Sequence, residues 1–282
     1  MKTGVAMPRK LFCEINSFTY KISLFKEQIK RYLCWFFDEK KYAKAISNEQ
    51  LPNVIYRHSS LIRRTLGNVD ATLQNNKAVN LSLTAPKING ILIKPGETFS
   101  FWRLAGNCNK RKGYLEGLVI KTQGPGKGIG GGMCQLTNLI HWMVLHSPLD
   151  ITEHHHHNQL DMFPDFNRQI PFGSGTSVCY NHIDYQFTNN TDKTFQIMVH
   201  TTDEYLVGEL RCEGVLDTAY HIIEKNSCFT YEEGEYYRNN EIYRTVLDKH
   251  TGETISEQLI IKNHARVMYD SRYIPSGQLK HI

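Results

Sequence analysis

The sequence predicts an α+β fold, in which an N-terminal helical arm precedes a mixed central region and an antiparallel, β-rich C-terminal half. Apolar residues recur at helical spacing between Lys21 and Phe36 and again between Cys134 and His146. From about residue 178 onward, short alternating stretches such as "TFQIMVHT" and "YLVGELRC" are divided by polar turns, as in antiparallel strands. At 282 residues and 40% hydrophobic content, the chain is long enough to bury a core.

The arm is expected at residues 1–48, ahead of one domain at 49–282 with a central α/β part to about 175 and a β-rich part at 176–282. Its apolar positions are spaced by three or four residues, and lysines cover much of the remaining surface. We expect this apolar face to pack on the body of the protein. The alternative is a peripheral helix that contacts an anionic membrane through residues 21–45. The apolar positions are Ile22, Phe25, Ile29, Leu33 and Phe36.

The positive charge of the chain is local. The formal net charge is +5, yet residues 1–44 hold ten Lys/Arg against four Asp/Glu, so the remaining 238 residues sum to −1. This distribution argues against a nucleic-acid partner for the main domain. Seven cysteines without a C-x-x-C pair, and an N-terminus unlike a secretory signal, predict a cytoplasmic protein, with a peripheral position at the inner membrane face as the alternative.

The central region reads as short elements divided by turns. A helical segment runs into Pro86, the stretch "ILI" follows the turn at residues 89–90, and "LVIKTQ" at 118–123 is a second strand. The helix from Cys134 to His146 is expected to bury one face and to end at Ser147. That face is formed by Leu136, Leu139, Ile140 and Met143.

A glycine-rich loop leads directly into that helix as "GPGKGIGGGMCQ", residues 124–135. It lacks the Lys-Ser/Thr pair of a phosphate-binding loop and the spacing of a dinucleotide fingerprint. Cys134 falls in the first turn, where the helix dipole and free N–H groups lower a thiol pKa. The sequence therefore predicts a cysteine nucleophile, with an oxyanion loop formed by Gly130, Gly131, Gly132 and Gln135. The alternative is a buried helical cysteine behind a flexible loop.

The run "TEHHHH" at residues 152–157 offers a base for the thiol. If residues 151–157 form a strand, alternation places Glu153, His155 and His157 on one face, where Glu153 can orient a histidine. Catalysis without a metal or other cofactor is the preferred interpretation. The alternatives are solvent-exposed histidines, a metal-stabilised turn, and a zinc site made by His155, His157 and Cys134.

Together, "GGGMCQLTN", "TEHHHH" and "LIKPGETFSFWRLAG" closely resemble the VanW family of bacterial proteins, and the likeness covers most of the chain. The family is named for a protein encoded in gene clusters for vancomycin resistance. Two departures stand out: His154 replaces the arginine of the Glu-Arg-His-x-His pattern, and Gly175-Thr176 replaces an Asp-Ala pair. The family correspondence selects Glu153, His155 and His157, the face already grouped by strand alternation.

The resemblance implies a role in glycopeptide resistance and cell-wall metabolism. Some extracellular proteins with this domain look like cysteine L,D-transpeptidases, which predicts a peptidoglycan stem peptide or its precursor as the partner. Cys134 would be the nucleophile, His155 or His157 the base and later acid, and Glu153 the orienting carboxylate. The second class of function is a non-enzymatic accessory protein that binds a cell-wall precursor or a partner. The missing acid at Gly175 favours that class somewhat.

Overall fold

The structure is a computed structural model that describes residues 11–64, 70–121, 124–156, 160–165 and 168–280. Its helical elements are η1 (Phe12–Glu14), α1 (Ser17–Phe37), α2 (Ala71–Thr84), η2 (Ala85–Lys87), α3 (Phe101–Ala105), η3 (Lys110–Lys112), α4 (Met133–Leu145), η4 (Ser271–Tyr273) and η5 (Ser276–Gln278). Its strands are β1 (Lys41–Tyr42), β2 (Asn53–Leu61), β3 (Ile91–Ile93), β4 (Glu97–Ser100), β5 (Glu116–Lys121), β6 (Gly124–Ile129), β7 (Asp150–Glu153), β8 (Leu160–Asp161), β9 (Gln186–Thr188), β10 (Phe195–Thr201), β11 (Tyr205–Cys212), β12 (Thr218–Glu232), β13 (Glu235–Asp248), β14 (Thr254–Val267) and β15 (Leu279–Lys280).

The strands form four sheets, with the orders β1-β4-β9-β7, β2-β11-β10-β3, β15-β12-β13-β14-β8 and β5-β6. Neighbours are antiparallel except for the short pairs β1–β4, β12–β15 and β14–β8, which are parallel. The α+β class, the N-terminal helix and the antiparallel C-terminal half are therefore confirmed.

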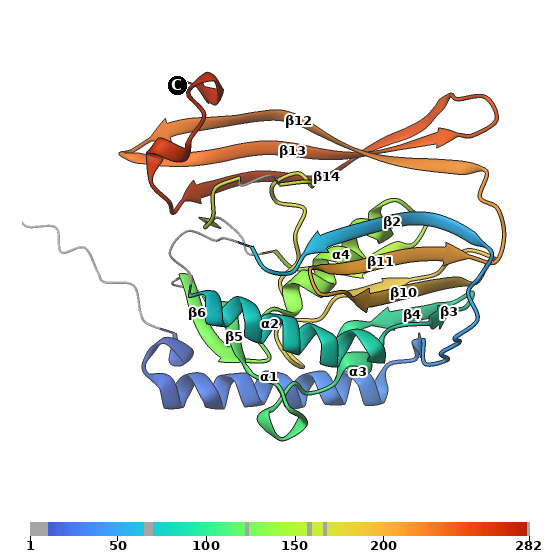
Figure 1. Cartoon of the computed structure of the whole chain (residues 1–282), viewed down its shortest axis with the longest axis horizontal. Coiled ribbons are helices and arrows are strands. Elements are labelled where there is room, and N and C mark those ends of the chain that lie inside the picture. The colour runs from blue at the N-terminus through green and yellow to red at the C-terminus, as the bar shows by residue number, and fades with distance from the viewer. Residues whose placement is uncertain (1–10, 65–69, 122–123, 157–159, 166–167, 281–282) are drawn as a thin grey trace, which may run out of the picture.

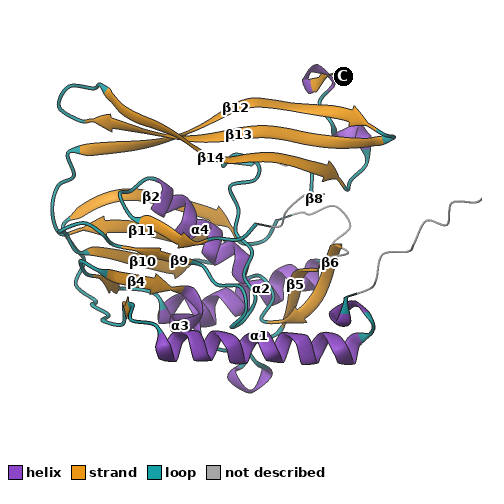
Figure 2. Ribbon diagram, turned by 180° about the vertical axis from the view of Figure 1, so that it is seen from behind, coloured by secondary structure: helices purple, strands orange, loops and turns teal. Residues whose placement is uncertain are grey.

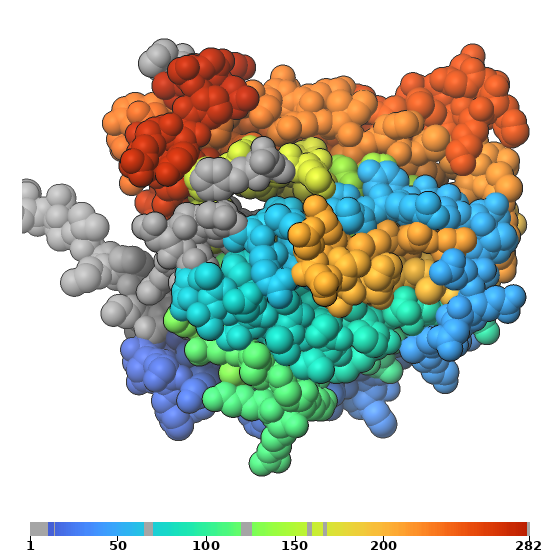
Figure 3. Space-filling model, viewed as in Figure 1, coloured from blue at the N-terminus to red at the C-terminus, as the bar shows by residue number. Residues whose placement is uncertain are grey.

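The sheets and helices are stacked in layers (Figures 1 and 2). The long ribbon β12–β13–β14 lies along one side of the molecule, and α1 lies along the opposite side. Between them are the two four-stranded sheets and helices α2 and α4. In the space-filling view, α1 forms the lower surface in blue (Figure 3). The central and C-terminal regions share both four-stranded sheets, since β11 pairs with β2 and β9 pairs with β4.

Helix α4 is the centre of the hydrophobic core. Leu136, Leu139, Ile140 and Met143 are all buried, which confirms the face predicted from the sequence. The helix lies against β11 and β2, and Gly208 of β11 makes this approach possible. A Cβ atom added there would lie 2.7 Å from Cδ2 of Leu139 and 2.9 Å from Cε of Met143, well inside van der Waals contact.

The expected orientation of α1 is wrong. Its apolar residues Ile22, Phe25, Ile29, Leu33 and Phe36 are 43–81% exposed instead of packed on the body. The physical reason is that the opposite face of the helix carries the polar groups that find partners in the body.

Helix α1 is held against the body of the protein by two parallel hydrogen bonds from Arg31 to Glu153, which we call the fork. Both terminal nitrogens of Arg31 donate to the carboxylate of Glu153 at 2.6 Å, and Nη2 also donates to the carbonyl of His182 at 2.9 Å. Nearby, Gln28 Nε2 donates to the carbonyl of Tyr180 at 3.3 Å. Burial by itself raises the pKa of Glu153, but the hydrogen bonds from Arg31 and from the Asp184 N–H outweigh it and keep the pKa below its ordinary value.

Replacing Arg31 by Met should lower the free energy of unfolding by about 2 kcal/mol, because it leaves the half-buried Glu153 carboxylate without its partner. Since the pKa of Glu153 is lowered in the folded state, the loss should be present above pH 4.5 and shrink as the pH falls below it. Urea titration at several pH values measures this. Arg57→Met is the matched control: its guanidinium is 66% exposed beside Glu209, so the cost should stay below about 1 kcal/mol. Equal losses in the two variants would contradict the assignment.

Candidate functional site

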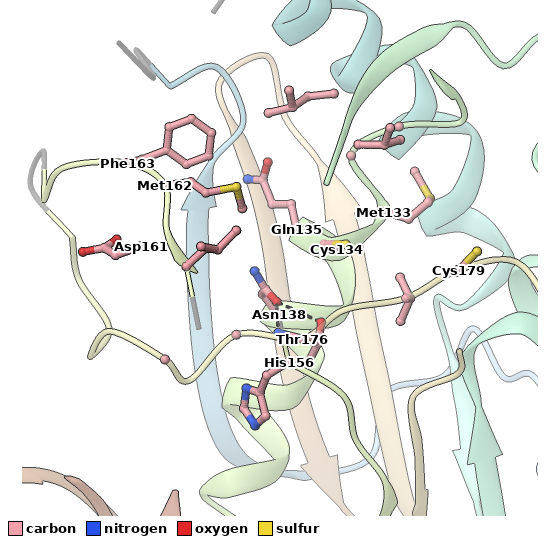
Figure 4. Close-up of a pocket in the computed structure, with 18 of the residues that line it drawn as sticks. Met133, Cys134, Gln135, Asn138, His156, Asp161, Met162, Phe163, Thr176 and Cys179 are labelled. Atoms are coloured by element: carbon pink, nitrogen blue, oxygen red, sulfur yellow. Dashed lines mark hydrogen bonds between the residues drawn. The ribbon is translucent and has the colours of Figure 1, made fainter. Parts of the chain in front are cut away.

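A cleft of about 1450 Å³ lies between the glycine loop, the start of α4 and strand β14. Gly130, Gly131, Gly132, Cys134 and Gln135, the predicted loop and thiol, all line it. The residues labelled in Figure 4 come from α4, from the chain near Asp161, from the segment that includes Thr176 and Cys179, and from the histidine run at His156. The glycine loop and Cys134, which are adjacent in the sequence, thus form one wall of the cleft.

Cys134 is the second residue of α4, and Gly132 with φ +104° is the N-cap. Its side chain is partly buried. Burial raises the pKa of the thiol, and the N–H groups of Val178 and of Cys134 itself, which point at the sulfur, only partly offset this. The helix N-terminus thus stands where the sequence predicts it, but the expected net lowering of the pKa is wrong because desolvation is the larger effect.

The glycine loop is tightly packed rather than loose. The N–H of Gly130 donates to the carbonyl of Leu115 at 2.9 Å, and that of Gly131 donates to Gly128 at 3.1 Å. A Cβ on Gly131 would lie 2.3 Å from the carbonyl carbon of Gly117, so two backbones meet there without side chains. Because the N–H groups of Gly130 and Gly131 already donate to backbone carbonyls, an oxyanion would have to bind to N–H donors in the first turn of α4.

The side-chain amide of Gln135 also makes hydrogen bonds within the fold. Its Nε2 donates to Oγ of Ser60 and to the carbonyl of Leu61, both at 2.9 Å. Its Oε1 is buried and has no hydrogen-bond donor within the described part of the chain. In this state the amide nitrogen of Gln135 is already used as a donor, so its side chain has no free donor for an oxyanion.

The segment that carries Gly175 runs beside α4. Asn138 Oδ1 accepts hydrogen bonds from the N–H of Thr176 at 2.6 Å and from its hydroxyl at 2.9 Å, and Thr137 shares a hydrogen bond with the same hydroxyl (Figure 4). A Cβ at Gly175 would meet Asn138 at 3.5 Å, an ordinary contact. The position therefore has room for a Cβ atom, the first atom of the aspartate side chain that the family pattern has there.

The predicted acid and one histidine meet outside the cleft. Strand β7 ends at Glu153 after a register shift, so the strand expected through residue 157 is not formed in the described residues. The Glu153 carboxylate accepts from Arg31, from the Asp184 N–H at 3.0 Å and from His155 Nε2 at 3.2 Å. Neither Glu153 nor His155 lines the cleft. His157 lies outside the described residues.

The histidine that does line the cleft is His156. Its ring lies 4.0 Å from that of His154, which lies 4.1 Å from the buried His141, and His141 Nδ1 is 3.1 Å from the Tyr185 hydroxyl. His154 Nε2 donates to the carbonyl of Gly175 at 3.1 Å. Burial and the neighbouring imidazoles lower the pKa of His154 to about 4, so it is neutral at pH 7. The same strand alternation that groups His155 with His157 puts His154 and His156 on the opposite face, and this pattern was the signal available in the sequence.

Two basic residues in the cleft have no carboxylate partner in the part of the chain that the structure describes, and the sequence did not reveal them. Arg64 and Lys77 line the cleft, and no salt bridge forms at either one within the described residues. Burial, and then the charges of Arg64 and Arg63, lower the pKa of Lys77 to about 7. Arg168 and Lys262 line the cleft as well, but each pairs with a carboxylate, at 2.5 and 3.1 Å. The cleft is therefore suited to an anion.

A metal site has no support in the part of the chain that the structure describes, where no three His, Cys, Asp or Glu side chains are grouped to hold an ion. The zinc set proposed from the sequence includes His157, which falls outside those residues.

The chain was compared with known proteins. A family model described as "VanW like protein" matches residues 76–211, which contain the glycine loop, Cys134 and the histidines. The chain is 33% identical over 246 residues to "Vancomycin B-type resistance protein VanW" of Enterococcus faecalis (strain ATCC 700802 / V583), covering 86% of this chain and 89% of that protein. It is 25% identical over 150 residues to "Uncharacterized protein YoaR" of Bacillus subtilis (strain 168), covering 53% of this chain and 48% of that protein. No solved structure matches.

Replacing Gly132 by Ala should lower the free energy of unfolding by about 3 kcal/mol, as judged by urea titration. The substitution forces a positive φ on a residue with a Cβ and places that Cβ 2.3 Å from Lys77 Cγ. Gly96→Ala is the matched control, because Gly96 has φ +76° with no atom within 4 Å and should cost only about 1 kcal/mol. If the two variants lose the same stability, packing against Lys77 is unimportant.

Replacing Lys77 by Met should make the protein more stable at pH 6 by on the order of 3 kcal/mol. The pKa of Lys77 is about 7 when folded and higher when unfolded, so the folded state holds an unfavourable buried charge below pH 7 and loses its proton first as the pH rises. The advantage of the variant should therefore shrink between pH 7 and pH 10.5. Lys127→Met, at a position where the side chain is 55% exposed, is the control and should not reproduce this gain in stability.

Proposed function

The chain belongs to the VanW-like family, and we propose that it carries out cysteine-dependent acyl transfer or hydrolysis on an anionic peptide of the peptidoglycan type or its precursor. The observation that carries this proposal is the placement of Cys134 at the start of α4, inside a cleft that also contains Arg64 and Lys77, two basic residues with no salt bridge to any described residue. A nucleophile and a recognition site for carboxylates thus share one cavity.

In the proposed reaction, the sulfur of Cys134 attacks an amide carbonyl carbon of the bound peptide. The C–N bond breaks, the amine leaves with the proton that the thiol gives up, and a thioester forms. A second amine or a water molecule then attacks the thioester and releases the thiol. We assign the N–H groups of the first turn of α4, at the positive end of that helix, as the donors to the negative oxygen that develops in each step.

The thiol needs a base because its pKa is raised in the free protein. We assign this role to His156, which lines the cleft, in preference to His155, which is hydrogen-bonded to Glu153 outside it. Glu153 then acts as an anchor for Arg31 and not as the group that orients the base.

The family context supports a cell-wall substrate. A relative that is 33% identical is named a vancomycin B-type resistance protein, and we propose that this chain serves glycopeptide resistance in the same way. Stem peptides carry free carboxylates, which match the charge of Arg64 and Lys77.

The test is to incubate the full chain with a tetrapeptide muropeptide and to map any thioester by mass spectrometry. The adduct should form on Cys134 and not on the exposed Cys34, and its rate should still rise at pH 9 because burial raises the pKa of the thiol. At pH 6, where Lys77 is charged, Lys77→Met should slow it at least tenfold at subsaturating peptide by removing a cation that binds the substrate.

The matched pair His156→Gln and His155→Gln identifies the base. His156→Gln should slow thioester formation about a hundredfold, whereas His155→Gln should change it less than twofold. If His155→Gln slows the reaction more than His156→Gln does, the base is His155, as the sequence predicted.

A second candidate function is a non-enzymatic protein that binds a cell-wall precursor in the same cleft. It is favoured by the raised pKa of Cys134 and by the commitment of Glu153 to Arg31. In this case the muropeptide should bind, with loss of affinity in Lys77→Met, yet leave no adduct on Cys134 from pH 5 to pH 9. Calorimetry beside the mass measurement separates the two functions.

A further inference from the structure

The outward side of α1 is a continuous apolar strip, which we call the outer face of α1. Its members lie three or four residues apart, so they follow one side of a helix that is about 30 Å long. All of them are exposed in the structure, from 43% for Ile22 to 81% for Phe36. The outer face consists of Phe18, Ile22, Phe25, Ile29, Leu33 and Phe36.

Lysines flank this strip on both sides. On a helix of 3.6 residues per turn, Lys26 and Lys30 fall along one edge of the outer face and Lys21 falls along the other. All three are exposed, and no salt bridge engages them within the described residues. An apolar strip with lysines along both edges is the pattern of a helix that lies in the surface of an anionic bilayer.

The helix cannot hide this strip by rolling over. Its inward side is held by the fork from Arg31 to Glu153 and by the hydrogen bond between Gln28 and the chain near Tyr180. Turning the outer face inward would break these contacts and would bury apolar side chains against polar partners. We propose that α1 binds an anionic lipid surface through its outer face, with the fold holding the helix in the orientation that this contact needs.

A lipid surface fits the charges better than a second copy of the chain does. Two outer faces packed together would bring their lysine rows near each other, whereas anionic headgroups neutralise them. The helix would lie in the surface and not cross it. In agreement, the described residues include no helix with the length and apolar character of a membrane span. Phe18, Phe25 and Phe36 would insert at the level where acyl chains begin, and the lysines would reach the headgroups.

The experiment is a flotation assay of the full chain with vesicles of phosphatidylglycerol and phosphatidylcholine, and with vesicles of phosphatidylcholine alone. The protein should float with the anionic vesicles and bind the neutral ones at least tenfold more weakly. The variant Ile22→Ser, Phe25→Ser, Ile29→Ser should lose at least tenfold in binding to the anionic vesicles. The variant Lys21→Gln, Lys26→Gln, Lys30→Gln should bind both vesicles equally weakly.

The matched control is Val215→Ser, Ile255→Ser, Leu259→Ser, which removes three apolar side chains that are 68%, 57% and 46% exposed elsewhere on the molecule. It should float like the parent. The proposal is overturned if the parent does not float, if the Ile22→Ser, Phe25→Ser, Ile29→Ser variant binds as the parent does, or if the control variant loses as much binding as that variant. It is also overturned if the parent is a dimer by light scattering and the α1 serine variant is a monomer, since a second copy then covers the outer face. Thioester formation on Cys134 is a separate measurement, so either proposal can fail alone.

Discussion

The close packing of α4 on β11 is the contact on which the rest of the structure depends. Gly208 admits Leu139 and Met143 at distances that no Cβ would allow, so the helix lies directly on the sheet. At the start of the same helix, the backbones of Gly131 and Gly117 touch, which fixes the turn in front of Cys134. The thiol is therefore held by packing at both ends of its helix. The glycines before Cys134 therefore allow two backbone segments to pack in direct contact, and their role here is close packing and not flexibility.

Much of the fold could be predicted because helices and strands follow from the spacing of apolar residues within short segments of the sequence. The helix predicted from Cys134 to His146 is α4, Met133–Leu145, and the alternating stretches after residue 178 became β10–β14. The orientation of α1 could not be predicted in this way. Periodicity tells which side of a helix is apolar, but not what that side meets. The partner that decides the matter is Glu153, which stands 122 residues after Arg31 in the sequence.

The candidate site was predictable in part for the same reason. The glycine loop and Cys134 are adjacent in sequence, so their presence in one cleft follows from a short motif. The histidines were harder, because the face presented by each one depends on where β7 ends. Arg64 and Lys77 carry no motif. They come together with Cys134 only because the end of β2 and helix α2 both lie beside the start of α4, a non-local arrangement.

Helix α1 connects the proposed reaction in the cleft with the proposed contact to lipid. Tyr20 and Leu24 belong to the inward side of α1 and line the cleft that holds Cys134, while the outer face points away from the body. If the outer face lies on anionic lipid, this cleft is one helix diameter, roughly 10 Å, from the bilayer surface. A peptide tethered to a lipid through an anionic linkage would then reach Cys134 without leaving the membrane, and Arg64 and Lys77 would neutralise it. The outward orientation of the apolar side of α1 would therefore serve function. If that side packed inward, it would stabilise the fold, but α1 could not hold the cleft beside a lipid surface.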